Sequence, residues 1–207
     1  WVLRMGDPTM KPLPSMENVI DYPFTKYKSE FMDLCLIQNC RFFIATQTGP
    51  LEFAKLASKK ILLTNMYDQT KIFGRGILKH LYSKQDKRYL SIKESLLMDL
   101  RDSTHPLYGF SDENYAYVEN NEGEILNAVL EYMDFLSSDD LSLTSKQKEY
   151  NEYLKKYVYR LAIDTRTRIT SPRTHNDEEE IGMRYRVAAQ WEMQKGTLCA
   201  GFLEEHW

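Results

Sequence analysis

Apolar and polar residues follow strand and helix periods in turn along this chain. The clearest stretch begins with the apolar run Phe42–Ala45, which predicts a strand covered on both faces. Small residues at 46–50 predict a turn, and apolar positions at helical spacing over 51–57 predict a helix. The apolar run Ile61–Thr64 predicts a second buried strand. This order of elements predicts parallel strands joined by a right-handed crossover.

Shorter patterns extend the alternation in both directions. Further strands are predicted at 1–5, 18–22 and 115–119, and further helices start near Ser29, Ser91, Asn121 and Lys146. Gly74–Gly76 is expected to be a loop. The sequence therefore predicts an α/β fold: a Rossmann-like parallel sheet flanked by helices over 1–140, and a helical extension over 141–207. Because the chain begins inside a strand pattern, we expect it to be the carboxyl-terminal part of a longer protein.

Composition narrows the classes of function. A formal net charge of -3 over 207 residues gives no support to a nucleic-acid partner. No apolar run approaches the roughly 20 residues of a membrane span. Three cysteines without metal-like spacing favour a reducing, cytoplasmic location, and four scattered histidines predict no metal site. The basic residues at 160–173 could meet an anionic acceptor or the inner face of the membrane, but we favour a solvated face beside the acidic run 177–180.

The turn between the first strand and its helix is the leading candidate for a binding site. Ligands of open parallel sheets bind beyond the carboxyl ends of the strands, and free N–H groups at a helix start attract anions. Thr46, Thr48 and Gly49 are therefore expected to bind a phosphate-bearing ligand. An ordinary helix cap is the alternative. Arg4 closes a strand, and its planar guanidinium suits a diphosphate, although an ion pair with Asp7 or Asp21 is the alternative.

Five more residues are weaker candidates for donor or acceptor contacts. Asp7 would orient the acceptor or the ribose, with an ordinary turn as the alternative, and Glu52 would accept hydrogen bonds from a ribose or a sugar, with a first-turn acid as the alternative. Lys11 would add positive charge near the phosphates, Arg75 would clamp a phosphate from the tip of a flexible loop, and Asn65 would make a contact at a strand end. No catalytic residue can be chosen among them.

Several segments resemble a family of bacterial glycosyltransferases of surface-polysaccharide biosynthesis. They are RMGDPTMKPLP, NVIDY, SEFMDLCLIQNCRFFIATQTGP and KKILLTN, in order over about 1–136, with a looser likeness in GTLCAGFLEEHW. The resemblance implies a GT-B type enzyme, in which this chain would be the donor-binding domain and a missing N-terminal domain would bind the acceptor. It also implies that Arg4 and the Thr46–Gly49 turn meet the donor diphosphate. Where the family pattern has a Ser-Gly turn, this chain has Gln47-Thr48-Gly49-Pro50, which leaves the donor's identity open.

The function implied by the resemblance is transfer of a sugar from a nucleotide-sugar to a polysaccharide or glycolipid acceptor. The resemblance implies no metal and no cofactor other than the donor substrate. Two alternatives stay open: an epimerase or hydrolase that acts on a nucleotide-sugar, and a non-catalytic binding or interaction module. The sequence leaves the nucleotide, the sugar and the oligomeric state undetermined.

Overall fold

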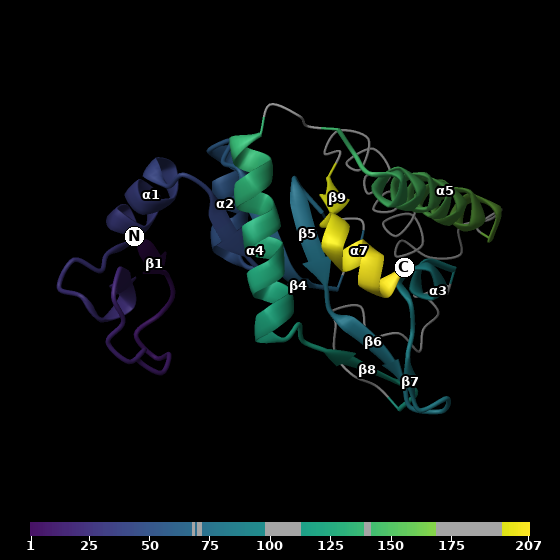
Figure 1. The fold of residues 1–207 in the computed structure, drawn as a ribbon, viewed down its shortest axis with the longest axis horizontal. Coiled ribbons are helices and arrows are strands. Elements are labelled where there is room, and N and C mark those ends of the chain that lie inside the picture. The colour runs from purple at the N-terminus through teal and green to yellow at the C-terminus, as the bar shows by residue number, and fades with distance from the viewer. Residues whose placement is uncertain (68, 70–71, 98–112, 139–141, 169–195) are drawn as a thin grey trace. The chain divides into compact units, whose positions relative to one another are not determined.

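A computed structural model describes residues 1–67, 69, 72–97, 113–138, 142–168 and 196–207 (Figure 1). The chain forms two compact units, of which the first comprises Trp1–Phe43 and Thr48–Lys60, and the second Ile44–Gln47 and Ile61–Trp207. The second unit thus continues past residue 140. The acidic run at 177–180 and the side chains of the basic residues at 160–173 lie outside the described part. Within that part, no helix is both long and apolar enough to cross a bilayer.

The first unit contains the two strands predicted near the N-terminus. Strands β1 (Val2–Arg4) and β2 (Val19–Asp21) pair in parallel as a sheet of their own. The single-turn helix η1 (Tyr22–Phe24) follows β2. Helix α1 (Glu30–Asn39) begins as predicted after Ser29, whose Oγ accepts a hydrogen bond from the Met32 N–H at 3.1 Å. Helix α2 (Gly49–Leu56) also belongs to this unit.

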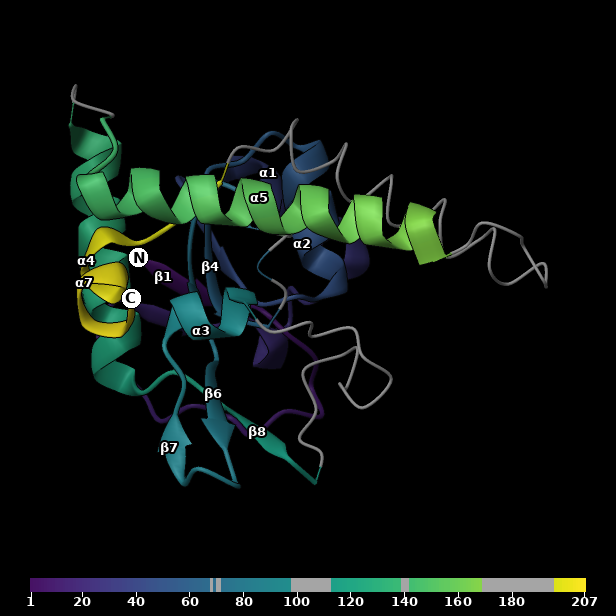
Figure 2. The same ribbon diagram turned by 90° about the vertical axis from the view of Figure 1, so that its right-hand side faces the viewer.

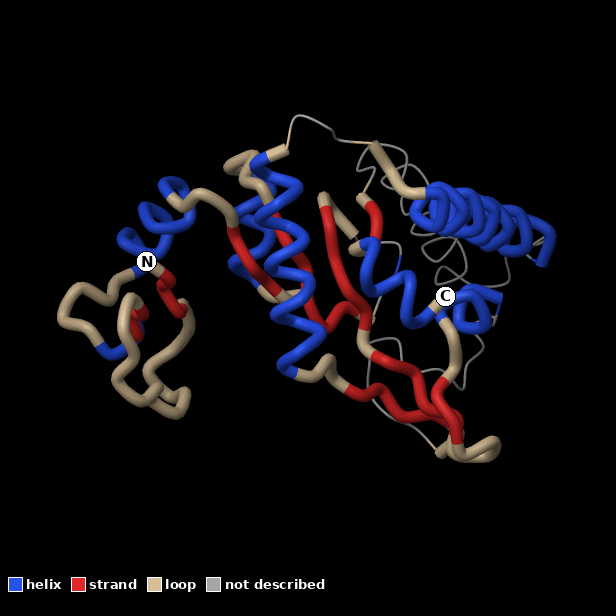
Figure 3. The backbone as a smooth tube through the Cα atoms, viewed as in Figure 1, coloured by secondary structure: helices blue, strands red, loops and turns tan. Residues whose placement is uncertain are grey.

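A parallel sheet lies at the centre of the second unit. Its strands are β3 (Phe43–Ala45), β4 (Ile61–Met66), β5 (Arg75–Leu78) and β9 (Thr197–Leu198), in the order β3-β4-β5-β9 (Figure 3). Side chains of the inner strands are buried, as predicted for Ile61–Thr64. The prediction that Phe42–Ala45 is covered on both faces is wrong, because β3 is an edge strand and Ile44 is 42% exposed.

The prediction of a loop at Gly74–Gly76 is also wrong. Gly74 has φ +68, and Arg75–Leu78 is an inner strand with four buried residues. A Cβ on Gly76 would lie 3.2 Å from the Leu63 Cβ, so this glycine permits close strand packing. β9, from the tail expected to be helical, extends the sheet through hydrogen bonds from the Thr197 and Cys199 N–H groups to the Gly74 and Gly76 carbonyls.

Helices and a smaller antiparallel sheet complete the second unit. The antiparallel sheet has the order β7-β6-β8, with β6 at His80–Ser83, β7 at Arg88–Tyr89 and β8 at Tyr115–Val118. The helices are α3 (Ile92–Leu97), α4 (Glu122–Ser137), α5 (Ser145–Arg168) and α7 (Ala200–His206). Helix α4 packs on β4 and β5, and α5 contacts α3, β9 and α7 (Figure 2). The predicted starts of α3 and α4 are confirmed.

Candidate functional site

Two asparagines fix the carboxyl ends of β4 and β5. Asn65, at φ +52 within β4, donates its backbone N–H to the Asn120 Oδ1 at 3.0 Å, and its own Oδ1 accepts from the Asn120 N–H at 2.7 Å. The Asn120 Nδ2 donates to the Leu78 carbonyl at 2.7 Å. Asn65, a predicted ligand contact, thus uses its amide oxygen to hold the chain that leads into α4. These three hydrogen bonds, which we call the Asn65–Asn120 clasp, place the start of α4 beyond the carboxyl edge of the sheet.

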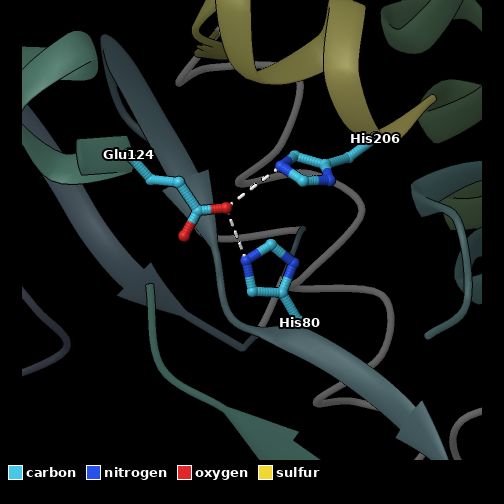
Figure 4. A group of neighbouring side chains, drawn as sticks. All are labelled: His80, Glu124 and His206. Carbon is cyan, nitrogen blue, oxygen red and sulfur yellow. Dashed lines mark hydrogen bonds and ion pairs between the residues drawn. The ribbon is translucent and has the colours of Figure 1, made fainter. Parts of the chain in front are cut away.

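Two histidines and a glutamate meet at this same edge (Figure 4). His80 is the first residue of β6 and follows β5 after a single residue, Glu124 lies in the first turn of α4, and His206 is the last residue of α7, which follows β9. The Glu124 Oε1 lies 2.7 Å from the His80 Nε2 and 3.1 Å from the His206 Nε2. The cluster therefore occupies the edge at which open parallel sheets bind ligands.

The capping box of α4 orients the Glu124 carboxylate. Its Oε2 accepts the backbone N–H of Asn121 at 2.8 Å, while the Asn121 Oδ1 accepts the Glu124 N–H at 3.0 Å. Because Oε2 is held by the helix start, Oε1 is the oxygen that faces the histidines. The Glu124 side chain is only 10% exposed, so the carboxylate is largely removed from water.

Aromatic rings surround the two imidazoles. The His80 ring lies edge-on to Tyr89 at a centroid distance of 5.7 Å, and the His206 ring lies 4.5 Å from that of Phe202. Burial lowers the pKa of His206 most, and the nearby His80 lowers it further, although Glu124 opposes the shift. A neutral imidazole keeps a nitrogen lone pair that can accept a proton or bind a metal ion. Beside the rings is a small pocket, lined by Tyr67, Gln69, Leu78, Ile92, Ser95 and Tyr117.

Contacts from α4 and α5 fix helix α7 and hence His206. The Glu131 carboxylate accepts the backbone N–H groups of Ala200 at 2.6 Å and Gly201 at 2.9 Å. The terminal Trp207 packs edge-on against Tyr150 and Tyr153 of α5. The position of His206 is therefore determined by side chains more than fifty residues earlier in the sequence.

The predicted phosphate-binding turn lies between β3 and α2, as the sequence indicated. Thr46 and Gln47 follow β3, and Thr48 is the N-cap residue of α2, but its side chain makes no capping hydrogen bond. Thr48 and Gly49 are exposed, and a Cβ on Gly49 would meet no atom within 4 Å apart from its chain neighbours and the backbone of its own helix. The Thr48 hydroxyl and the backbone at Gly49 are thus open to a ligand.

Three other predicted contacts in the first unit, Arg4, Asp7 and Glu52, have structural partners for their side chains. Arg4 pairs with Asp21 at 2.6 Å and donates to the Lys11 carbonyl at 3.0 Å, which is the structural alternative to diphosphate binding. The Asp7 Oδ1 accepts the Thr9 N–H within a turn, and this bond lowers the pKa of Asp7. Glu52 pairs with Lys55 at 2.6 Å on the exposed side of α2. A ligand role for each of these side chains stays a prediction.

Arg75 lies inside the sheet and is not at the tip of a loop. Its side chain is 8% exposed, and its guanidinium carbon lies 4.3 Å from the Phe135 ring centroid. Burial lowers the pKa of Arg75, although Cys199 and Glu131 oppose the shift. Within the described residues, no carboxylate is at ion-pairing distance from this guanidinium. The arginine therefore acts mainly as a packing residue with a cation–π contact.

This position gives a first testable prediction. Arg75→Met keeps the length of the stem and removes a poorly compensated charge, so we expect unfolding free energy to change by less than about 1 kcal/mol. Arg75→Ala also removes the stem that packs on Phe135, and should cost about 2–3 kcal/mol. Urea unfolding of both variants measures the difference. Equal losses in the two variants would mean that the charge, and not the stem, is what stabilises the strand.

His80 and His206 are scattered in the sequence but meet in the structure, with ring centroids 4.7 Å apart, while His105 and His175 lie outside the described residues. Glu124 and His206 are 82 residues apart, so no local motif joins them. The available signals were that His80 follows a strand end and that Glu124 occupies the third position of a capping box. Neither signal reveals that α7 returns His206 to this edge.

Comparisons of the chain with protein-family models, with curated proteins and with solved structures found no match. The resemblance to glycosyltransferases therefore rests on the sequence motifs quoted above. What the described residues establish is an α/β fold with a parallel four-stranded sheet flanked by helices.

Proposed function

We propose that this chain is the nucleotide-sugar-binding half of a glycosyltransferase, which moves a sugar to a polysaccharide or glycolipid acceptor. The observation that carries the proposal is the turn from Thr46 to Gly49. It follows a parallel strand, begins a helix, and leaves the Thr48 hydroxyl and the Gly49 backbone uncommitted. A helix start of this kind favours phosphate oxygens through its N–H groups and its dipole.

The proposed chemistry is stabilisation of the leaving nucleoside diphosphate. As the bond between the sugar and the diphosphate breaks, negative charge grows on the phosphate oxygens, and preorganised donors at the turn would lower the barrier. No protein nucleophile is needed for this step. Arg4 contributes in the same way only if a donor displaces it from Asp21. The acceptor-binding site and the catalytic base would belong to the preceding domain of a longer protein. Donor binding is therefore the activity to test on this chain.

Gly49→Ala gives a sharp test of the proposed turn. Apart from its chain neighbours the new methyl group meets nothing within 4 Å, so the variant should fold with a modest loss of stability, because a residue before Pro50 disfavours the helical conformation. The methyl group would, however, obstruct a phosphate close to the backbone. We expect one of UDP, GDP, CMP or dTDP to raise the melting temperature of the wild type, and Gly49→Ala to weaken that nucleotide about tenfold or more. Thr48→Val, which removes the hydroxyl, should weaken it less.

Gly201→Ala is the matched control, because it places a methyl group in the first turn of another helix, at an ordinary 3.5 Å from Glu131. Equal nucleotide affinity in Gly49→Ala and wild type would exclude the turn as the phosphate site. Turnover of a labelled nucleotide-sugar by the longer protein then distinguishes the activities. Sugar transferred to an acceptor supports the proposal, and sugar released to water without acceptor indicates a hydrolase.

A further inference from the structure

We propose that His80, Glu124 and His206 form a binding site for a divalent transition metal ion, and that Zn²⁺ fits it best. Two imidazole nitrogens and one carboxylate oxygen are a donor set that zinc accepts, with a fourth position left for water or another ligand. The three ligand atoms all lie within 4.8 Å of one another. This site shares no residue with the Thr46–Gly49 turn and does not depend on the proposed glycosyl transfer.

The distances between the ligand atoms are close to those that zinc requires. Zinc–nitrogen and zinc–oxygen bonds of about 2.0–2.1 Å in a tetrahedron put neighbouring ligand atoms about 3.3 Å apart. The Glu124 Oε1 is 2.7 Å from the His80 Nε2 and 3.1 Å from the His206 Nε2. Both nitrogens converge on a single oxygen, as Figure 4 shows. Small side-chain rotations would therefore open the cluster enough for the ion to replace these contacts.

The surroundings hold the ligands in place before a metal binds. The Asn121 N–H fixes the second oxygen of Glu124, and outer contacts of this kind orient ligands in metal sites. Tyr89 and Phe202 pack against the His80 ring. The three side chains are 17%, 10% and 27% exposed, so the ion would be partly shielded from water while the small pocket keeps access for a fourth ligand.

A fourth protein ligand is also within reach. The Glu205 Oε2 lies 3.7 Å from the His206 Nε2, and its side chain is 62% exposed and free to turn. The three principal ligands come from β6, α4 and α7. Binding would therefore tie the C-terminal helix to the carboxyl edge of the sheet, and should stabilise the folded chain, because a preformed site of this kind is absent from the unfolded state.

The test uses the untagged chain, stripped with a chelator and titrated with Zn²⁺. We expect one ion per chain by calorimetry and by elemental analysis, and a higher melting temperature with zinc. Co²⁺ in the same site should give the visible absorption of a tetrahedral complex. His80→Ala and His206→Ala should each weaken zinc at least about a hundredfold, since loss of a direct ligand exceeds the 10–100-fold effect of an outer contact.

Glu124→Gln separates ligation from folding. Glutamine can also complete a capping box, so the metal-free variant should melt near the wild type, yet lose most of its zinc affinity with the carboxylate. Glu122→Gln, the same change at an exposed position in the same turn of α4, is the control and should bind zinc as the wild type does. Failure of the wild type to bind one equivalent at micromolar zinc would overturn the proposal. So would equal affinity in wild type and Glu124→Gln, whatever the outcome of the nucleotide experiment.

Discussion

Asn120→Ala is expected to lower the free energy of unfolding by about 3–5 kcal/mol, because it removes two hydrogen bonds to backbone groups of β4 and β5, of which the one to Leu78 is buried. Asn120 is 7% exposed, and its side chain accepts the Asn65 N–H and donates to the Leu78 carbonyl. Alanine can make neither of these bonds, which lie at the ends of adjacent inner strands. Urea unfolding, with the slope checked for two-state behaviour, measures the loss.

Further variants of the Asn65–Asn120 clasp separate the contributions of its individual hydrogen bonds to stability. Asn120→Asp keeps the acceptor for Asn65 but faces the Leu78 carbonyl with a second oxygen, so it should also be strongly destabilised. Asn65→Gly keeps the ability to adopt φ +52 and removes only the bond from the Asn120 N–H, at a cost of about 1–2 kcal/mol. Asn65→Ala should be worse than glycine, because alanine is strained at that angle. A loss below 1 kcal/mol in Asn120→Ala would show that water satisfies the two groups.

The parts of the fold that sequence predicts well are those set by neighbouring residues. Ser29 begins α1, Asn121 begins α4, and the apolar run Ile61–Thr64 is buried in β4. Caps and apolar periods depend on residues a few positions apart, so one sequence reveals them. At Gly74–Gly76 a local pattern typical of a loop occurs in a strand, because the chain uses one glycine for a positive φ and the other for close contact with Leu63.

The candidate site depends on contacts that the sequence does not encode locally. The sequence left Arg4 open to a diphosphate or to an ion pair with Asp7 or Asp21, and the parallel pairing of β1 and β2 brings Asp21 beside it. The opposite happened at His80, Glu124 and His206, which share no spacing and are united only because β5 ends, α4 begins and α7 ends at one edge of the sheet. The topology of the fold determines which charged side chains come together, and a single sequence specifies that topology only weakly.

Gly196→Ala should be as damaging as Asn120→Ala, at about 3–5 kcal/mol, because its methyl group would collide with backbone. A Cβ on Gly196 would lie 2.1 Å from the Ile72 carbonyl oxygen and 2.5 Å from its carbon. No side-chain rotation can relieve that overlap, so the start of β9 must move away from the segment that enters β5. Urea unfolding of Gly196→Ala beside Gly201→Ala, a change in the same tail with only ordinary contacts, tests this reasoning.

The same pair of variants links the tail to the proposed metal site. If displacement of β9 carries α7 with it, Gly196→Ala should lose zinc affinity although every proposed ligand is intact, while Gly201→Ala should keep it. Zinc titration of the folded fraction of each variant distinguishes this from simple unfolding. Wild-type zinc affinity in a destabilised Gly196→Ala would mean that α7 is held in place by Glu131 and by the packing of Trp207 on α5, independently of β9. Position 196 thus tests whether the strand or the helix contacts bring His206 to the edge of the sheet.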